Sequence, residues 1–252
     1  MSVALITGGA TGIGRGFANM LADQGYDLII TSRNLDNLAK AQKEIQDKYK
    51  RKVNIFIADI TDEEAREKLY DYALNYDVSV VVNNAGIGLS KDFLDASLEE
   101  EMAIIDLNII AFQAIFKHFY RKFRENASGR IINISSVAGF LPGPHASTYY
   151  ASKAYATSIT RAVAYESRNI KDLRIQCVCP GATRSNFFKH AGTKEKAYRY
   201  DPDKLALGAL KSKRVVYSPG FKAKMTHVIG KLFPTKLVMF FASRRLKRIR
   251  DK

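Results

Sequence analysis

The 252-residue chain has no tryptophan, only two cysteines and only six prolines. Cys177 and Cys179 are two positions apart in a predicted strand and could hardly bridge each other, so a disulfide framework is excluded and a reducing compartment is expected. No linker rich in proline, glycine or serine divides the chain, and no internal repeat or low-complexity segment occurs. These absences favour one large globular domain.

Long hydrophobic runs are also lacking. The apolar stretch that follows Met1 is too short for the core of a signal peptide. The longest late run, LVMFFA at 237–242, has six residues, far below the ~18 that a membrane-spanning helix needs. The sequence therefore predicts a cytoplasmic protein without a spanning segment.

Negative charge is scarce in one part of the chain only. Residues 1–181 contain 21 basic and 21 acidic residues, whereas 182–252 contain 19 basic and 4 acidic residues. The whole net charge of +15 therefore lies in the last 71 residues. Such an excess indicates an acidic partner, which could be a membrane surface, a carrier protein, an anionic ligand or nucleic acid. A solvated basic face is an equally weighted alternative, and nucleic acid is disfavoured because no helix-turn-helix or aromatic RNA-binding signature occurs.

Short β-branched runs alternate with longer helical patterns along the chain. Strands are predicted at 3–7, 27–32, 53–58, 79–82, 130–135, 174–179 and 214–217. Helices are predicted at 12–24, 35–49, 62–76, 98–126, 148–168 and 202–211. The alternation predicts right-handed βαβ units and a parallel sheet with helices on both faces, which is a doubly wound α/β domain.

The last segment, 218–252, has a different pattern. A turn at 218–220 precedes apolar residues at helical spacing, Pro234 interrupts them, and a second helical pattern follows among many basic residues. Apolar and basic residues together are typical of a helix at a membrane interface. The favoured alternative is a pair of helices packed on their own domain or on a partner subunit.

A glycine-rich turn joins the first strand to the first helix. It contains Gly8, Thr11, Gly12, Ile13 and Gly14. Glycines there permit a tight turn and a close approach of the backbone to a pyrophosphate, and the start of the helix directs N–H groups and its positive dipole end at that anion. Placed between a strand and a helix, the motif predicts a dinucleotide site rather than a ligand-free turn.

The end of the second strand bears on which dinucleotide binds. NAD-selective sites generally place a carboxylate there for the ribose 2′-hydroxyl, but the residues at 31–34 include no acid. Ser32 can bond a phosphate oxygen, and Arg33 can pair with a 2′-phosphate. The sequence therefore predicts NADP(H), with a surface role as the alternative for Arg33.

Together with later motifs, these residues resemble the short-chain dehydrogenase/reductase family. The motifs are the glycine turn, the sequence NNAG at 83–86, Asn108 in a long helix, Ser136 thirteen residues before a Tyr149-x-x-x-Lys153 pair, and PG at 180–181. The resemblance covers residues 1–217 and implies a single Rossmann domain with a seven-stranded parallel sheet of order 3-2-1-4-5-6-7. The basic extension at 218–252 departs from the commonest family pattern and resembles a bacterial subgroup of reductases.

The chemistry of the central motif also follows from its residues. Tyr149 and Lys153 are four apart on one helix and share a face. A neighbouring ammonium, together with the positive charge of a nicotinamide, is expected to lower the pKa of the tyrosine, so that Tyr149 acts as general acid toward a carbonyl or as base toward an alcohol. Ser136 would hold the substrate oxygen. The resemblance implies that Lys153 also bonds the nicotinamide ribose and that Asn108 holds a water beside it, with a core amide as the alternative for Asn108.

The resemblance implies further contacts with the cofactor. Asp59 would bond the adenine amino group, Asn84 and Gly86 would pass the adenosine ribose, and Thr183 would meet the nicotinamide carboxamide. The remaining expected contacts are with Tyr149, Lys153, Pro180, Gly181 and Ser185. No cluster of His, Cys, Asp or Glu has metal-ligand spacing, so no metal is expected.

Two segments, 140–145 and 186–200, are expected to line the substrate cleft. Both are rich in aromatic and apolar residues, which favours a hydrophobic ketone or alcohol, and His145 is expected to be loop structure rather than a substrate contact. The leading hypothesis is a cytosolic NADP(H)-dependent carbonyl reductase or alcohol dehydrogenase, expected as a dimer or tetramer through helices 98–126 and 148–168. The alternatives are a reductase of a substrate linked to a carrier protein or lipid and, less favoured, an NADP(H)-binding sensor.

Overall fold

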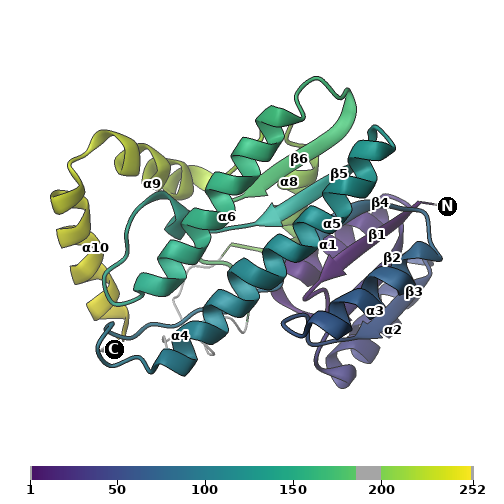
Figure 1. Ribbon diagram of the computed structural model, residues 1–252, viewed down its shortest axis with the longest axis horizontal. Coiled ribbons are helices and arrows are strands. Elements are labelled where there is room, and N and C mark those ends of the chain that lie inside the picture. The colour runs from purple at the N-terminus through teal and green to yellow at the C-terminus, as the bar shows by residue number, and fades with distance from the viewer. Residues whose placement is uncertain (1, 186–199, 251–252) are drawn as a thin grey trace.

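The computed structural model describes residues 2–185 and 200–250, whose strands form one seven-stranded parallel sheet (Figure 1). The order β3-β2-β1-β4-β5-β6-β7 confirms the expected topology. The strands are β1 (Val3–Thr7), β2 (Asp27–Ser32), β3 (Val53–Ile57), β4 (Val78–Asn83), β5 (Ser128–Ile134), β6 (Asp172–Val178) and β7 (Val216–Tyr217). The strand order reverses between β1 and β4, and in such sheets ligands bind at the carboxyl ends of the strands beside that point.

Helices cover both faces of the sheet, as predicted (Figure 1). They are α1 (Gly12–Asp23), α2 (Leu35–Tyr49), α3 (Glu63–Leu74), α4 (Leu98–Ile105), α5 (Phe112–Glu125), α6 (Ser147–Glu166), α8 (Pro202–Lys211), α9 (Gly220–Leu232) and α10 (Thr235–Arg250), with a π-helical turn η1 (Asp106–Ala111) and a 3₁₀ turn η2 (Val137–Phe140). The sequence patterns located the helices before residue 218 to within about one turn. Helices such as α2, α5 and α8 bury an apolar face, whereas most of the buried residues of α6 are polar.

The sheet has a hydrophobic core on each face. Alternate residues of β1 belong to opposite cores: Ala4 and Ile6 pack with α1, α2 and α8, whereas Val3 and Leu5 pack with α3, α5 and α6. This division follows from the two-residue period of a strand. The apolar run in β1 is therefore buried on both sides and holds the carboxyl end of the strand, where the glycine turn begins, in a fixed position.

The long helix predicted at 98–126 is interrupted. The π-helical turn η1 separates α4 from α5, a feature that the hydrophobic pattern did not reveal. The stretch Leu98–Glu125, 28 residues long, also meets the length and hydropathy of a membrane span, contrary to the expectation that no segment would. A core helix meets the same criteria, and α5 buries Phe112, Phe116 and Phe119 against the sheet.

The two cysteines lie side by side at the end of β6. Both are fully buried and free, and their Sγ atoms are 3.6 Å apart, well beyond the S–S bond length of about 2 Å. They act as small core residues, as the sequence indicated.

The C-terminal segment forms two helices, α9 and α10, at the end of the molecule away from the N-terminus (Figure 1). Pro234 separates them, as the sequence predicted. Helix α9 packs against η2, and both Ala223 and Val238 are buried. The segment is therefore attached to its own domain next to the loop that carries Ser136.

Candidate active site

A large cavity, of about 1650 Å³, lies at the carboxyl ends of the central strands. Of the predicted site residues, all except Gly14 and Asn108 line it. These residues come from turns after β1, β2, β3, β4, β5 and β6 and from α6. The topology thus brings together residues that are far apart in the sequence.

The glycine turn has the conformation that a nucleotide cradle needs. Gly8 and Gly12 have φ values of +62° and +56°, in the left-handed region. A Cβ on Gly14 would lie 2.2 Å from the carbonyl oxygen of Gly8, so the start of α1 can approach the end of β1 only because this residue has no side chain. Gly12 and Ile13, at the start of α1, line the cavity, and the N-terminus of a helix is a favourable place for a pyrophosphate.

A hydrogen-bond brace joins this turn to the strand beside it. The Thr7 hydroxyl accepts bonds from the backbone N–H groups of Asn84 (2.9 Å) and Ala85 (3.0 Å), and the Asn84 amide donates to the Thr7 carbonyl (2.9 Å). The brace spans β1 and β4, which flank the point of reversal in the sheet. Asn84 therefore shapes the glycine turn as well as lining the cavity, and Thr7, which sequence reasoning did not assign, is its partner.

The end of the cavity at β2 contains Ser32, Arg33 and Asp59. The Arg33 side chain is 70% exposed, and its Nη1 lies 3.5 Å from Asp59 Oδ2. Burial raises the pKa of Asp59, but hydrogen bonds from Thr61 and the nearby Arg33 guanidinium outweigh this effect and hold it below the ordinary value. Asp59 is thus a pre-ordered carboxylate acceptor beside an exposed guanidinium.

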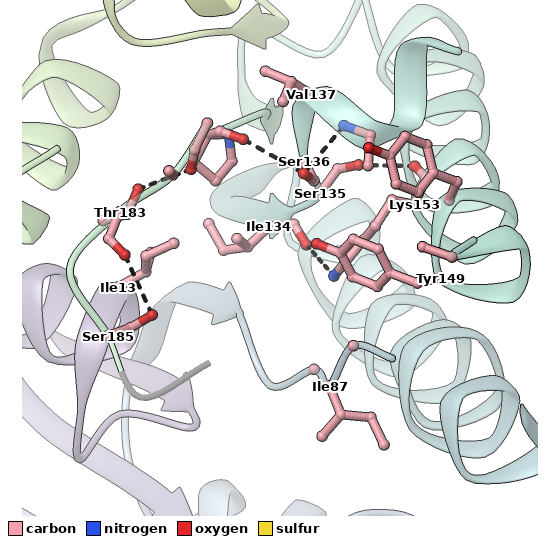
Figure 2. Close-up of a pocket in the computed structure, with 18 of the residues that line it drawn as sticks. Ile13, Ile87, Ile134, Ser135, Ser136, Val137, Tyr149, Lys153, Thr183 and Ser185 are labelled. Atoms are coloured by element: carbon pink, nitrogen blue, oxygen red, sulfur yellow. Dashed lines mark hydrogen bonds between the residues drawn. The ribbon is translucent and has the colours of Figure 1, made fainter. Parts of the chain in front are cut away.

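Ser136, Tyr149 and Lys153 point into the same part of the cavity (Figure 2). Ser136 caps η2 by accepting a bond from the Ala138 N–H group (3.1 Å), and Lys153 Nζ donates to the Ile134 carbonyl (3.2 Å). The neighbouring Ser135 is held elsewhere, with its hydroxyl 2.8 Å from the Lys153 carbonyl. The two adjacent serines therefore have different hydrogen-bond partners, although both line the cavity.

Burial dominates the ionisation of this group of residues. It raises the pKa of Tyr149 to about 12, although a hydrogen bond with Ser136 opposes the increase. Burial also lowers the pKa of Lys153 to about 8. The expected lowering of the tyrosine pKa is thus not produced by the protein groups alone, because loss of hydration opposes the tyrosinate more strongly than the neighbouring residues favour it.

Comparisons with known proteins agree with this geometry. The sequence profile described as short chain dehydrogenase matches residues 2–196. The chain belongs to the short-chain dehydrogenase family. An uncharacterized oxidoreductase of Staphylococcus saprophyticus is 33% identical over 181 residues, 71% of this chain and 77% of that protein. The 3-oxoacyl-[acyl-carrier-protein] reductase FabG of Chlamydia muridarum is 31% identical over 180 residues, 71% of this chain and 72% of that protein.

A solved structure is similar over nearly the whole chain. The short-chain dehydrogenase of Sphingobium yanoikuyae in complex with NADPH matches with a TM-score of 0.83 and 26% identity, covering 91% of this chain and 93% of that one. This short-chain dehydrogenase is therefore an oxidoreductase of a family with nucleotide-binding members. The family profile ends at residue 196, so α9 and α10 lie beyond the matched region.

Asn108 of this dehydrogenase lies in the π-helical turn, behind the cavity. Its amide accepts a bond from the Ile87 N–H group (3.0 Å) and donates to the Ile87 carbonyl (2.8 Å) and the Ser152 hydroxyl (3.0 Å). A Cβ on Gly86 would lie 3.0 Å from Asn108 Oδ1 and 3.2 Å from Lys153 Nζ. The side chain thus fixes the loop after β4 beside the lysine, and π turns of this kind frequently occur at functional sites.

The chain after β6 closes the cavity on the side of the glycine turn. Thr183 is buried and donates to the Gly181 carbonyl (3.2 Å), and Ser185 packs so closely that a Cβ on Gly12 would lie 2.7 Å from its Cβ. Pro180 also lines this wall. The expected substrate segment 186–200 lies outside the described residues except for Tyr200, which lines the cavity.

His145, in the loop before α6, contacts the loop after β4 and helix α10. Its Nδ1 contacts Asp92 in the loop after β4, and its Nε2 lies 2.7 Å from the Ser243 hydroxyl of α10. Its φ of +67° is unusual for a residue with a side chain. The sequence assigned His145 to loop structure, which fits these contacts, but it did not predict that α9 and α10 would form part of the cavity wall.

Proposed function

We propose that this short-chain dehydrogenase is an NADP(H)-dependent reductase of a hydrophobic ketone, which also oxidises the corresponding alcohol. The observation that carries the proposal is the position of Ser136, Tyr149 and Lys153 in the same cavity as the glycine cradle. Gly8 and Gly12 line this cavity without side chains, which leaves their backbone open to a pyrophosphate, and an added Cβ would meet Asn84 at 2.9 Å or Ser185 at 2.7 Å.

Each residue has a definite part in the reaction. NADP(H), when bound, supplies or accepts the hydride. Ser136 holds the substrate oxygen by a hydrogen bond that strengthens as charge develops on it. Tyr149, whose pKa is raised to about 12, is protonated at neutral pH and donates its hydroxyl proton to that oxygen. Lys153, whose pKa is lowered to about 8, is mostly charged at neutral pH and stabilises the tyrosinate that remains.

The test of this mechanism is Tyr149→Phe. The substitution removes the proton donor and little volume, so NADPH binding should persist while ketone-dependent NADPH consumption falls by about 10³-fold. Tyr150→Phe is the matched control, since Tyr150 lines the same cavity without lysine four residues later. Turnover retained in the Tyr149 variant would refute the mechanism. Tight NADPH binding with no turnover of any ketone by the unmodified enzyme would favour a sensor.

The preference for NADP(H) rests on the acid-free end of β2. Ser32 and Arg33 line the cavity, and Arg33 has the exposed guanidinium that a 2′-phosphate requires. Ser32→Asp should raise KM for NADPH at least about tenfold and lower KM for NADH, because a carboxylate repels the phosphate and accepts bonds from a 2′-hydroxyl. Ser32→Ala is the uncharged control. Equal effects of Ser32→Asp on both cofactors would count against the preference.

A substrate linked to an acidic carrier protein is a second candidate, which the excess of basic residues after 181 favours. The protein would then act in the cytoplasm or at the inner surface of a membrane.

Pairing of subunits through α4, α5 and α6 is also part of the proposal, and light scattering of the purified protein would measure it.

A further inference from the structure

The exposed apolar side chains of α9 and α10 fall into two sets. One set lines the cavity and the other does not. The lining set comprises Phe221, Met225, Ile229, Phe233, Leu237 and Phe241. The outer set comprises Val228, Leu232 and Phe240. Among the described side chains of the two helices, those that line the cavity are all uncharged, although this part of the chain is strongly basic.

The exposed apolar members of the lining follow the two helices in a row, and smaller residues beside them also line the cavity. The members of the row follow one another at intervals of four residues, from 221 to 241. Residues four apart on a helix lie above one another, about 6 Å apart along the axis. The row therefore has one part on α9 and one part on α10, with Phe233 in the turn between them. An elongated row of this kind fits a flexible chain better than it fits a compact ring system.

The row is held in place relative to the reacting residues. The bond between His145 and Ser243 attaches α10 to the loop that precedes Tyr149, and His145 also contacts Asp92. Val238 and Ala223 are buried. The wall is therefore a built part of the cavity rather than a free tail.

Apolar residues of the catalytic domain share the cavity with the row and with the reacting centre. Leu107, Leu141 and Tyr150 line it together with Tyr149. Apolar surface exposed to a water-filled cavity is unfavourable, and an apolar ligand that covers it gains from the removal of that surface from water. The cavity thus offers a polar centre at Ser136 and Tyr149 and an apolar arm along the two terminal helices.

We infer that this arm binds an extended hydrocarbon chain of the substrate, so that the enzyme selects ketones with a long unbranched alkyl or acyl chain. The inference rests on the proposed function for the position of the carbonyl, which would lie at Ser136 and Tyr149. The residues of the arm select chain length and take no part in the proton transfer.

The test begins with a homologous series of straight-chain methyl ketones and the full-length enzyme with NADPH. Because each buried methylene stabilises binding, KM should fall on the order of threefold per added methylene until the arm is filled. A compact polycyclic ketone serves as the comparison. A KM that does not change with chain length, or a better fit of the polycyclic ketone, would overturn the inference.

Matched substitutions separate the arm from the outer face. Leu237 lines the cavity and is 44% exposed, whereas Leu232 does not line it and is 75% exposed. Leu237→Ala should flatten the dependence of KM on chain length and weaken the longest ketones on the order of tenfold. Leu232→Ala should leave the whole series unchanged. Ile229→Ala and Val228→Ala form a second pair of the same kind. Equal effects of the inner and outer substitutions would overturn the inference.

A binding measurement tests the arm independently of the reaction. Calorimetry with NADP⁺ and a long-chain methyl ketone reports binding without reduction, since NADP⁺ has no hydride to donate. Affinity that rises with chain length and falls in Leu237→Ala would support the arm even if no ketone were reduced, in which case the proposed function alone fails. Absence of any chain-length effect on binding would overturn the arm whatever the turnover.

Discussion

Lys153 is a residue whose surroundings conflict with its charge. It is 6% exposed, and burial lowers its pKa to about 8 from an ordinary value of 10.5. The fold therefore holds a cation that is poorly hydrated when no cofactor is bound. Such a site costs stability, and the proposed reaction, in which this charge stabilises the tyrosinate, gives a reason for keeping it.

The cost is measurable as a dependence of stability on pH. Because the folded pKa lies below the unfolded one, the unfolded chain binds more protons between about pH 8 and 10.5, and stability from this group rises with pH across that window. Below about pH 8 the penalty is fully present. Lowering the pKa of Lys153 from 10.5 to about 8 corresponds to roughly 3 kcal/mol.

Lys153→Met should therefore stabilise the cofactor-free protein at neutral pH by about 1–3 kcal/mol and abolish turnover. The gain should shrink as the pH rises toward 10.5, and thermal unfolding followed at several pH values measures it. Lys153→Arg, which keeps a charge, is the control and should not stabilise. A Lys153→Met protein that unfolds at a lower temperature than the unmodified protein at neutral pH would contradict the assignment of burial as the dominant effect.

Among the elements, the turn from β1 to α1 depends on the absence of a side chain at Gly14. In most helices the replacement of glycine by alanine stabilises by about 1 kcal/mol. At Gly14 the sign should reverse, because the added Cβ would lie 2.2 Å from the Gly8 carbonyl oxygen and 2.6 Å from the Asn84 amide. The glycine is thus required by the close approach of two elements.

Gly14→Ala should destabilise the protein by about 2 kcal/mol or more and weaken NADPH binding at least about tenfold, since the cradle must open to admit the methyl group. Denaturant unfolding and NADPH titration measure the two effects. Gly25→Ala is the control: a side chain at its φ of +94° costs about 1 kcal/mol, but a Cβ added there would have no atom within 4 Å. NADPH affinity unchanged in Gly14→Ala would show that the cradle tolerates the shift.

Elements were predictable where a local pattern determines them. The two-sided burial of β1, β2 and β4 produces continuous apolar runs, and the faces of α2 and α8 follow the helical period, so their positions could be read directly. The π turn at Asp106–Ala111 could not, because one inserted residue hardly changes a hydrophobic period. Asn108 was found by its position in a motif, while its bonds to Ile87 depend on a loop that is distant in sequence.

At the scale of the whole molecule, the excess of basic residues and the proposed reacting residues lie in different parts of the chain. Residues 1–181 contribute equal numbers of acids and bases, and the excess lies after them. The sequence revealed this asymmetry and the two terminal helices, but not where they pack. That position depends on contacts between α9 and η2 and between His145 and Ser243, which no local pattern encodes.

If an acidic carrier protein presents the substrate, KM for the carrier-linked ketone should rise several-fold between low and physiological salt, because exposed charges are screened over about 8–10 Å. KM for a short free ketone should change little under the same conditions. Steady-state kinetics at a series of ionic strengths distinguish the two. The same salt dependence for both substrates would assign the effect to the anionic cofactor instead.

The wall formed by α9 and α10 gives the enzyme a modular order along its chain. In the proposed function, the nucleotide cradle is encoded near the start, the proton-transfer residues in the middle, and the apolar row at the end. Exchange of the C-terminal segment between relatives is therefore a route to a new substrate selectivity in which Ser136, Tyr149 and Lys153 are kept. For the engineer, a library at the exposed positions of the row, with the buried Ala223 and Val238 and the His145–Ser243 contact kept, would vary the proposed substrate arm and retain the packing next to Ser136 and Tyr149.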